Sequence, residues 1–237
     1  MSALAQDTQP EPADDRVIKQ RRVAVGVDLG QSHDPTSIAV IEQIKHVIPQ
    51  CVADKMLRSD VAELRKSLPR PHYHLHLLEQ APLGEAYPLQ AQRVKRILAR
   101  PHIAEHDPRV IVDYTGVGRA VYEIFQQARV PRMLPVTITF NGQEGPNGRG
   151  GHNVPKLALI SRLQALMHTG CLEMSDSLPF AKVFRRELLN FRVSYSAVGN
   201  ATFGAREGAH DDLVLAVALA VYGLDSSREV TMEPLIV

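Results

Sequence analysis

RVAVGVDLG, residues 22–30, is a β-branched apolar run that ends at a glycine and carries Asp28 inside it. A second run of the same kind, TSIAVIE, follows at residues 36–42, and the polar connection QSHDP lies between them. The two runs predict a β-hairpin that opens the domain. A carboxylate within a core strand costs several kcal/mol unless something neutralises it. Asp28 is therefore the first candidate functional residue.

The rest of the chain alternates short apolar runs with stretches of helical spacing. Strands are expected at residues 73–79, 109–113 and 134–140, and helices at 88–98, 119–128, 155–167, 178–190 and 211–222. Residues 44–71 are interpreted as a variable insertion, residues 141–153 as a glycine-rich loop, and residues 191–203 as a hairpin that turns near Gly199 and Asn200. This order predicts an α/β fold: a mixed five-stranded sheet flanked by helices, with an added β-hairpin before the last helix.

The length of 237 residues, 44% of them hydrophobic, suits one substantial core. We expect one domain over residues 22–224, a disordered leader over 1–21 and a C-terminal tail over 225–237. The leader lacks the apolar segment of a signal peptide, and no run approaches the roughly 20 apolar residues of a membrane helix. A cytoplasmic location without membrane contact is therefore expected. Cys51 and Cys171 have no partner at zinc-ligand spacing, so the histidines and cysteines do not predict a zinc site.

Acidic residues stand at unusual places in three of the predicted elements. Asp28 lies in an apolar strand, Asp113 ends another, and Asp211 and Asp212 open a helix that is otherwise apolar. Mg²⁺ and Mn²⁺ prefer carboxylate oxygens, and two such ions roughly 3.5 to 4 Å apart would activate a water and stabilise the departing oxygen at phosphorus. Each acid also has a structural explanation alone, as a partner of the hairpin turn, an Asx-turn or a helix N-cap. The combination favours a site for divalent metal.

Positive charge is concentrated in one part of the chain. Residues 146–206 contain eight Lys and Arg against three Asp and Glu, a balance of 8 minus 3, or +5, although the whole chain carries only +1. Such an asymmetry is what a face that contacts a phosphate backbone would have, and an ordinary solvated surface can have it too. The charge distribution alone leaves these two explanations open.

Three motifs resemble a known family. They are VGVDLGQSHDPTSIAV at residues 25–40, VIVDYTGVG at 110–118 and GAHDDLVLAVALA at 208–220. Together they resemble the C-terminal nuclease domain of the large terminase subunit of tailed phages, over residues 22–223. Supporting pieces are VPK at 154–156, GCLEM at 170–174 and RELLNF at 186–191. Each motif is weak alone, and their order and spacing make the set more specific.

The resemblance implies an RNase H-like fold and a metal-dependent endonuclease that cuts double-stranded DNA during genome packaging. Asp28 would bridge two Mg²⁺ or Mn²⁺ ions, Asp113 would join it, and Asp211 and Asp212 would complete the catalytic site, with Asp212 favoured as the deeper ligand. Phosphate contacts would come from five basic residues: Lys156, Arg185, Arg186, Arg192 and Arg206. The hairpin before the last helix would lie against the duplex.

A complete large terminase also carries an ATPase motor, and this sequence has no Gly-x-x-x-x-Gly-Lys-Ser/Thr phosphate loop. The expectation is a nuclease, encoded by a phage or prophage, that lacks the packaging ATPase domain. A separate packaging ATPase, a small terminase or a portal would then be its protein partners. Because phosphate contacts fix position without reading sequence, we expect little intrinsic sequence specificity.

Three other interpretations remain open at this stage. The run from Asp28 to Ser32 also resembles the first phosphate motif of sugar kinases and actin-like ATPases, although a second full motif is missing. A Holliday-junction resolvase-like nuclease would have its acids on a first strand and a last helix. A non-catalytic domain that binds DNA or the packaging machinery would not need the acids to be intact.

Overall fold

The computed structural model describes residues 14–30, 34–116, 118–148, 150–195, 201–205 and 211–226, with backbone alone for 118–119, 191–195 and 201–205. An eight-stranded mixed sheet in the order β6-β7-β5-β4-β1-β2-β3-β8 forms its centre. The strands are β1 Ile18–Asp28, β2 Ser37–Val47, β3 His72–Gln80, β4 Arg109–Asp113, β5 Met133–Thr139, β6 Gly145–Pro146, β7 His152–Pro155 and β8 Leu172–Met174. The predicted α/β class with a mixed sheet flanked by helices is confirmed.

The sheet is antiparallel on one side of β1 and parallel on the other. β1 pairs with β2 from Ile18 opposite Val47 to Asp28 opposite Ser37, and β2 continues antiparallel to β3. On its other side β1 pairs with β4, and the next pairs along the sheet are β4 with β5 and β5 with β7. All three of these pairs are parallel. Parallel strands need crossover connections. Helix α5 (Gly118–Gln127) lies in the connection from β4 to β5, whereas the connection from β5 to β7 holds the short strand β6. The carboxyl ends of β1 and β4 therefore meet at one edge of the sheet.

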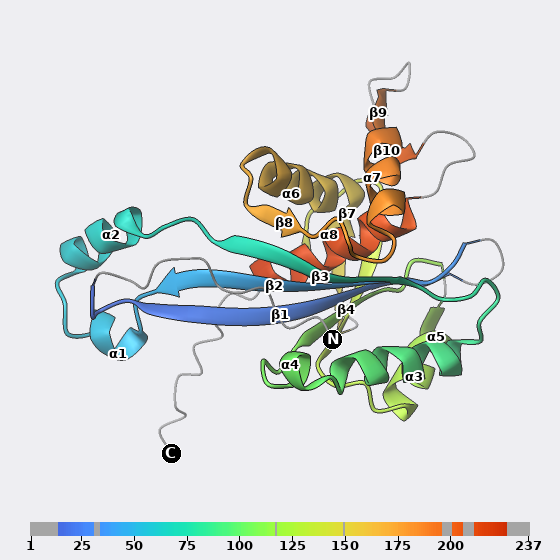
Figure 1. Ribbon diagram of the computed structural model, residues 1–237, viewed down its shortest axis with the longest axis horizontal. Helices are drawn as coiled ribbons and strands as arrows, with labels where there is room; N and C mark the ends of the chain where they lie inside the picture. The colour runs from blue at the N-terminus through green and yellow to red at the C-terminus, as the bar shows by residue number, and fades with distance from the viewer. Residues whose placement is uncertain are drawn as a thin grey trace.

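Helices cover both faces of the sheet (Figure 1). They are α1 Gln50–Ala53, α2 Arg58–Ser67, α3 Tyr87–Leu98, α4 Pro101–Ala104, α5 Gly118–Gln127, α6 Lys156–His168, α7 Ala181–Asn190 and α8 Asp212–Asp225. Helices α3, α4 and α5 lie on one face and α6, α7 and α8 on the other, while α1 and α2 lie beyond one end of β1 and β2. No helix within the described ranges is long and apolar enough to cross a membrane.

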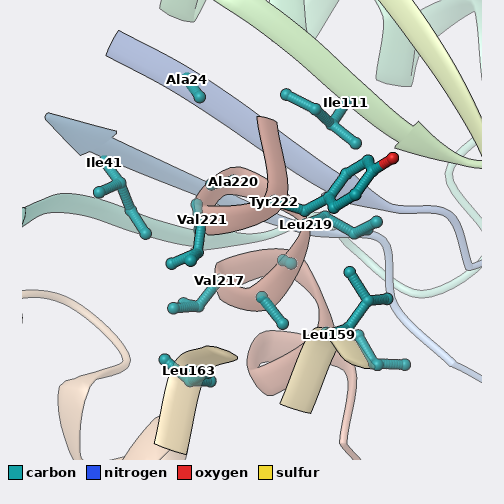
Figure 2. Close-up of a cluster of buried hydrophobic side chains, with 14 of the residues drawn as sticks. Ala24, Ile41, Ile111, Leu159, Leu163, Val217, Leu219, Ala220, Val221 and Tyr222 are labelled. Carbon is teal, nitrogen blue, oxygen red and sulfur yellow. The ribbon is translucent and has the colours of Figure 1, made fainter. Parts of the chain in front are cut away.

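Helix α8 is the centre of the larger hydrophobic core. Every residue from Asp212 to Leu224 is buried, as expected for a helix that is apolar on all sides. Figure 2 shows α8 between the sheet, represented by Ala24 and Ile111, and α6, represented by Leu159 and Leu163. The last helix is thus fixed on both sides, and its first residues have a defined place above the sheet.

Three strands and three short helical segments differ from the prediction. The sheet has eight strands where five were expected, because β6, β7 and β8 have only 2, 4 and 3 residues and are too short to show a period of two. They are defined by their pairing: β6 with β7, β7 with β5, and β8 with the distant β3. The predicted insertion holds α1 and α2, and a short α4 follows α3. β1 begins at Ile18, inside the predicted leader.

The added hairpin is present before the last helix. β9 (Phe191–Tyr195) pairs antiparallel with β10 (Ala201–Ala205) as a separate two-stranded sheet. Its first strand follows α7 without a break, and the hairpin extends from that helix (Figure 1). The predicted turn at Gly199 and Asn200 lies outside the described residues.

Candidate metal centre

Two of the predicted acids stand next to each other. Asp28 is the last residue of β1 and Asp113 the last of β4, and the pair before them, Val27 and Val112, are partners in the parallel register. Adjacent strands lie roughly 4.8 Å apart, so the two carboxylates leave the same edge of the sheet side by side. Each residue is only 9% exposed. The strands thus bring together two carboxylates that are 85 positions apart in the sequence.

A glycine in β1 sets the position of the acid pair that opens α8. A Cβ atom on Gly26 would lie 1.9 Å from the Ala216 carbonyl oxygen, so the helix backbone rests directly on the strand. Asp212 comes four residues before Ala216, roughly 6 Å along the helix, and Asp28 comes two residues after Gly26, roughly 6.5 Å along the strand. The contact at Gly26 therefore brings the start of α8 above the end of β1.

The charges of these acids act on one another. Burial, followed by the charges of Asp113, Asp212 and Asp211, raises the pKa of Asp28 well above its ordinary value, while Lys156 opposes the rise. Burial also raises the pKa of Asp113. Like charges in a medium of low dielectric constant repel strongly. Asp113, Asp211 and Asp212 are thus each near enough to Asp28 to affect its pKa, and a cation placed beside Asp28 would be stabilised.

Asp113 is also held in a local turn. Its Oδ1 accepts hydrogen bonds from the Thr115 backbone N–H at 2.7 Å and from the Thr115 hydroxyl at 2.5 Å, which lower the pKa of Asp113 against the effect of burial. The Ile138 N–H donates to the Thr115 hydroxyl oxygen at 2.7 Å and fixes it to β5. The Asx-turn that the sequence offered as an alternative is therefore present, and it orients the carboxylate at the strand end.

The first turn of α8 is capped by a residue that the sequence did not reveal as important. Asp211 occupies the N-cap position without a side-chain capping bond. Instead the buried Glu187 of α7 accepts from the N–H groups of Leu213 at 3.0 Å and Val214 at 3.2 Å through Oε2. The N-cap explanation of the acid pair is therefore wrong, since Glu187 satisfies these donors.

The environment of Glu187 changes its acidity. Burial is the largest effect and raises the pKa of Glu187 to about 7, with Asp212 and Asp211 adding to the rise and the two backbone hydrogen bonds opposing it. A signal for this residue does exist in the sequence. Glu187 lies three positions after Phe184 and six after Ala181, on the buried side of α7. A charge at core-facing helical spacing indicates a buried partner.

Lys156 joins the acids from the start of α6. Its Nζ donates to Asp211 Oδ2 at 2.7 Å, and the side chains of the pair are 24% and 16% exposed. Across the described residues, no three or more His, Cys, Asp or Glu side chains are grouped so that they could hold a metal ion as they stand. The donor chemistry nonetheless fits a hard divalent cation, because carboxylates from β1, β4 and α8 converge and repel one another.

The other predicted phosphate contacts are less defined. Arg185 is half exposed on α7 and pairs with Asp176, and Arg186 next to it is exposed. Arg192 lies in β9, where only the backbone is described, and Arg206 lies outside the described residues. Both arginines lie on α7, which continues directly into β9 of the hairpin (Figure 1).

The comparison with solved structures identifies the fold. The large terminase nuclease from thermophilic phage G20c with bound magnesium aligns with a TM-score of 0.55 and 23% identity, covering 90% of this chain and 89% of that one. The chain has the fold of a large terminase nuclease. The G20c nuclease with bound cobalt aligns equally well, at a TM-score of 0.55 and 22% identity over the same 90% and 89%. The large terminase nuclease domain of Thermus phage P74-26 aligns with a TM-score of 0.51 and 20% identity, covering 90% of this chain and 87% of that one.

The alignments with these large terminase nucleases each cover 90% of the chain. No family model matches the sequence, and no curated protein matches it either. The likeness to large terminase nucleases is one of structure at low identity.

Proposed function

We propose that this chain is a divalent-metal-dependent endonuclease that cuts double-stranded DNA. The observation that carries the proposal is the pair of buried carboxylates, Asp28 and Asp113, at the ends of two adjacent parallel strands, with the acids of α8 above them. Four acids that repel one another at a buried edge have a high affinity for positive charge. The fold, which resembles large terminase nucleases solved with magnesium and cobalt, supports the same conclusion.

In this proposal Asp28, Asp113, Asp211 and Asp212 hold Mg²⁺ or Mn²⁺, with two ions in the full site. The ions would supply a water of lowered pKa and stabilise negative charge on the departing oxygen. Asp28 and Asp113 fix the position of the site from the rigid sheet, and the Thr115 hydrogen bonds keep Asp113 oriented. Asp212, buried at the start of α8, is the deeper of the two helix acids.

The side chains around the acids would position the duplex. Lys156 and the α7 arginines Arg185 and Arg186 supply positive charge for the phosphates. The β9–β10 hairpin extends from α7 and would rest against the DNA. In the reaction, water adds to phosphorus, one phosphorus–oxygen ester bond breaks, and the departing oxygen takes up a proton. A packaging ATPase, a small terminase or a portal is the proposed partner that would direct the cut.

Supercoiled plasmid DNA provides the test. With Mn²⁺ or Mg²⁺ the purified protein should nick and linearise the plasmid, EDTA should stop this, and Asp28→Ala or Asp113→Ala should abolish it. Asp60→Ala is the matched control, because Asp60 is an exposed acid on α2 at the other end of the sheet. Persisting cleavage in both active-site variants would refute the mechanism.

Assays of DNA binding, four-way junction cutting and ATP turnover on the same purified protein would identify the alternatives. DNA binding by the wild type without cleavage in either metal would favour a non-catalytic DNA-binding domain. Preferred cutting of four-way junctions by a dimer would favour a resolvase-like nuclease. ATP turnover would favour the kinase and actin-like branch of the fold.

A further inference from the structure

Lys156 occupies an unusual position for a DNA-contacting lysine. It is the first residue of α6, directly after β7, and its Nζ lies 2.7 Å from Asp211 Oδ2. Its charge also lowers the pKa values of Asp28 and Asp113 against the effect of burial. The ammonium group is therefore near acids contributed by β1, β4 and α8, in the region where the proposed metal ions would bind.

A lysine at this position conflicts with a metal ion in two ways. The Lys156 hydrogen bond occupies one side of Asp211 Oδ2 and reduces the negative charge that this oxygen offers to a metal ion. The ammonium and a divalent cation bound at these acids would also repel each other. Both effects weaken metal binding through Asp211 while Lys156 keeps this partner, and both are relieved when Lys156 moves to another anion.

A backbone phosphate is the anion that the proposed reaction brings to this place. Lys156 is only partly buried, with 24% of its side chain exposed, and four flexible methylenes let its ammonium exchange partners over several ångströms. A phosphate held above the acids would be repelled by their carboxylates, and a nearby ammonium group would offset this repulsion. The geometry therefore offers Lys156 two successive partners.

We propose that Lys156 is a positioning residue that competes with the metal for Asp211 and exchanges this carboxylate for a DNA phosphate. This inference rests on the proposed function, since it takes the acids as metal ligands and DNA as the substrate. Its consequence is that DNA and metal strengthen each other's binding, because the phosphate removes the ammonium from Asp211. By linkage, the increase must be the same in both directions. The metal site would then reach its full affinity only when DNA is bound.

The first experiment measures metal binding without DNA. Mn²⁺ binding to the full chain is followed by electron paramagnetic resonance and calorimetry for the wild type, Lys156→Met, Lys156→Arg and Lys66→Met. Lys156→Met should bind Mn²⁺ about tenfold tighter or more, because the competing charge is removed. Lys156→Arg keeps the charge and should stay within about threefold of wild type. Lys66→Met, on exposed α2, should behave as wild type.

The second experiment measures the coupling. Affinity for a labelled 30-base-pair duplex is determined by fluorescence anisotropy with and without Ca²⁺, which binds carboxylates without supporting rapid cleavage in many metal nucleases. The factor by which Ca²⁺ tightens DNA binding should be about tenfold larger in the wild type than in Lys156→Met. Thermal unfolding adds a readout for folding: Lys156→Met should be less stable than wild type in EDTA and should gain more from Mn²⁺.

The outcomes separate this inference from the function on which it rests. Equal or weaker Mn²⁺ binding by Lys156→Met, or an unchanged coupling factor, would overturn the exchange and leave Lys156 a fixed structural cation. Failure of the wild type to bind Mn²⁺ with or without DNA would overturn the metal site itself, and the exchange with it. Tighter Mn²⁺ binding together with a reduced coupling factor supports both.

Discussion

Gly26→Ala is the substitution that tests the geometry of the site most severely. The new Cβ would lie 1.9 Å from the Ala216 carbonyl oxygen and 2.6 Å from the Ala220 nitrogen. Ordinary contact begins at 3.4 Å, so α8 must retreat by about 1.5 Å (3.4 minus 1.9) from β1. Both obstructing atoms belong to the backbone of a buried helix, which cannot rotate away as a side chain would.

The stability cost follows from overpacking in a dense core. We expect a loss of about 3 kcal/mol in the free energy of unfolding, which for a chain of this size lowers the melting temperature by roughly 6 to 12 °C. Since Asp212 is one helical turn from Ala216, the same movement separates it from Asp28. Mn²⁺ should therefore raise the melting temperature of Gly26→Ala less than that of the wild type, and plasmid cleavage should fall even at temperatures where the variant is folded.

The control is Gly84→Ala. Gly84 has a φ of +79° and no atom within 4 Å of a Cβ, so alanine there costs only about 1 kcal/mol of backbone strain. Thermal unfolding by circular dichroism, with and without Mn²⁺, compares the two variants. A melting temperature for Gly26→Ala within about 2 °C of wild type, with full cleavage, would refute the direct contact between strand and helix.

Three further predictions concern residues around the acids. The free energy of unfolding of the wild type should fall as the pH rises from about 4.5 to about 7, because the folded state binds the Glu187 proton more tightly than the unfolded chain does. Glu187→Gln should flatten this part of the pH profile, measured by denaturant unfolding. An unchanged slope would disprove the raised pKa of Glu187. Thr115→Val removes the hydroxyl that favours ionised Asp113, so the acid limb of the cleavage rate should move to higher pH; a profile identical to wild type would contradict this role. Asp212→Asn should weaken Mn²⁺ binding in calorimetry more than Asp211→Asn does, because Asp212 is the more deeply buried acid; the reverse order would make Asp211 the principal ligand.

The sequence predicted the elements that carry the site well, because each has a strong local signal. The run RVIVD ends at residue 113 as β4 does, and the apolar helix begins within one residue of α8. Asp28 and Asp113 stood out because charge inside a core strand is costly. Both lie at the ends of buried strands, as the sequence predicts, and the structure adds that these strands are neighbours. Their metal-binding role stays a prediction.

What the sequence did not predict depends on contacts between distant segments. The spacing of Glu187 places it on the buried side of α7, but its partners, the first N–H groups of α8 some 26 residues later, appear only when the two helices pack together. Lys156 was predicted as a phosphate contact, and its ion pair with Asp211 spans 55 residues. The two- to four-residue strands β6, β7 and β8 have no pattern of their own, since they are defined by their pairing partners.

The most direct test of the central claim is the position of manganese in a crystal of the protein. Crystals soaked in Mn²⁺ should give anomalous scattering peaks in contact with the carboxylates of Asp28 and Asp113, with at least one helix acid, Asp211 or Asp212, completing the ligand set. Loss of these peaks in Asp28→Asn would agree with the account. Manganese bound elsewhere on the chain, or no peak at this edge of the sheet at saturating Mn²⁺, would contradict it.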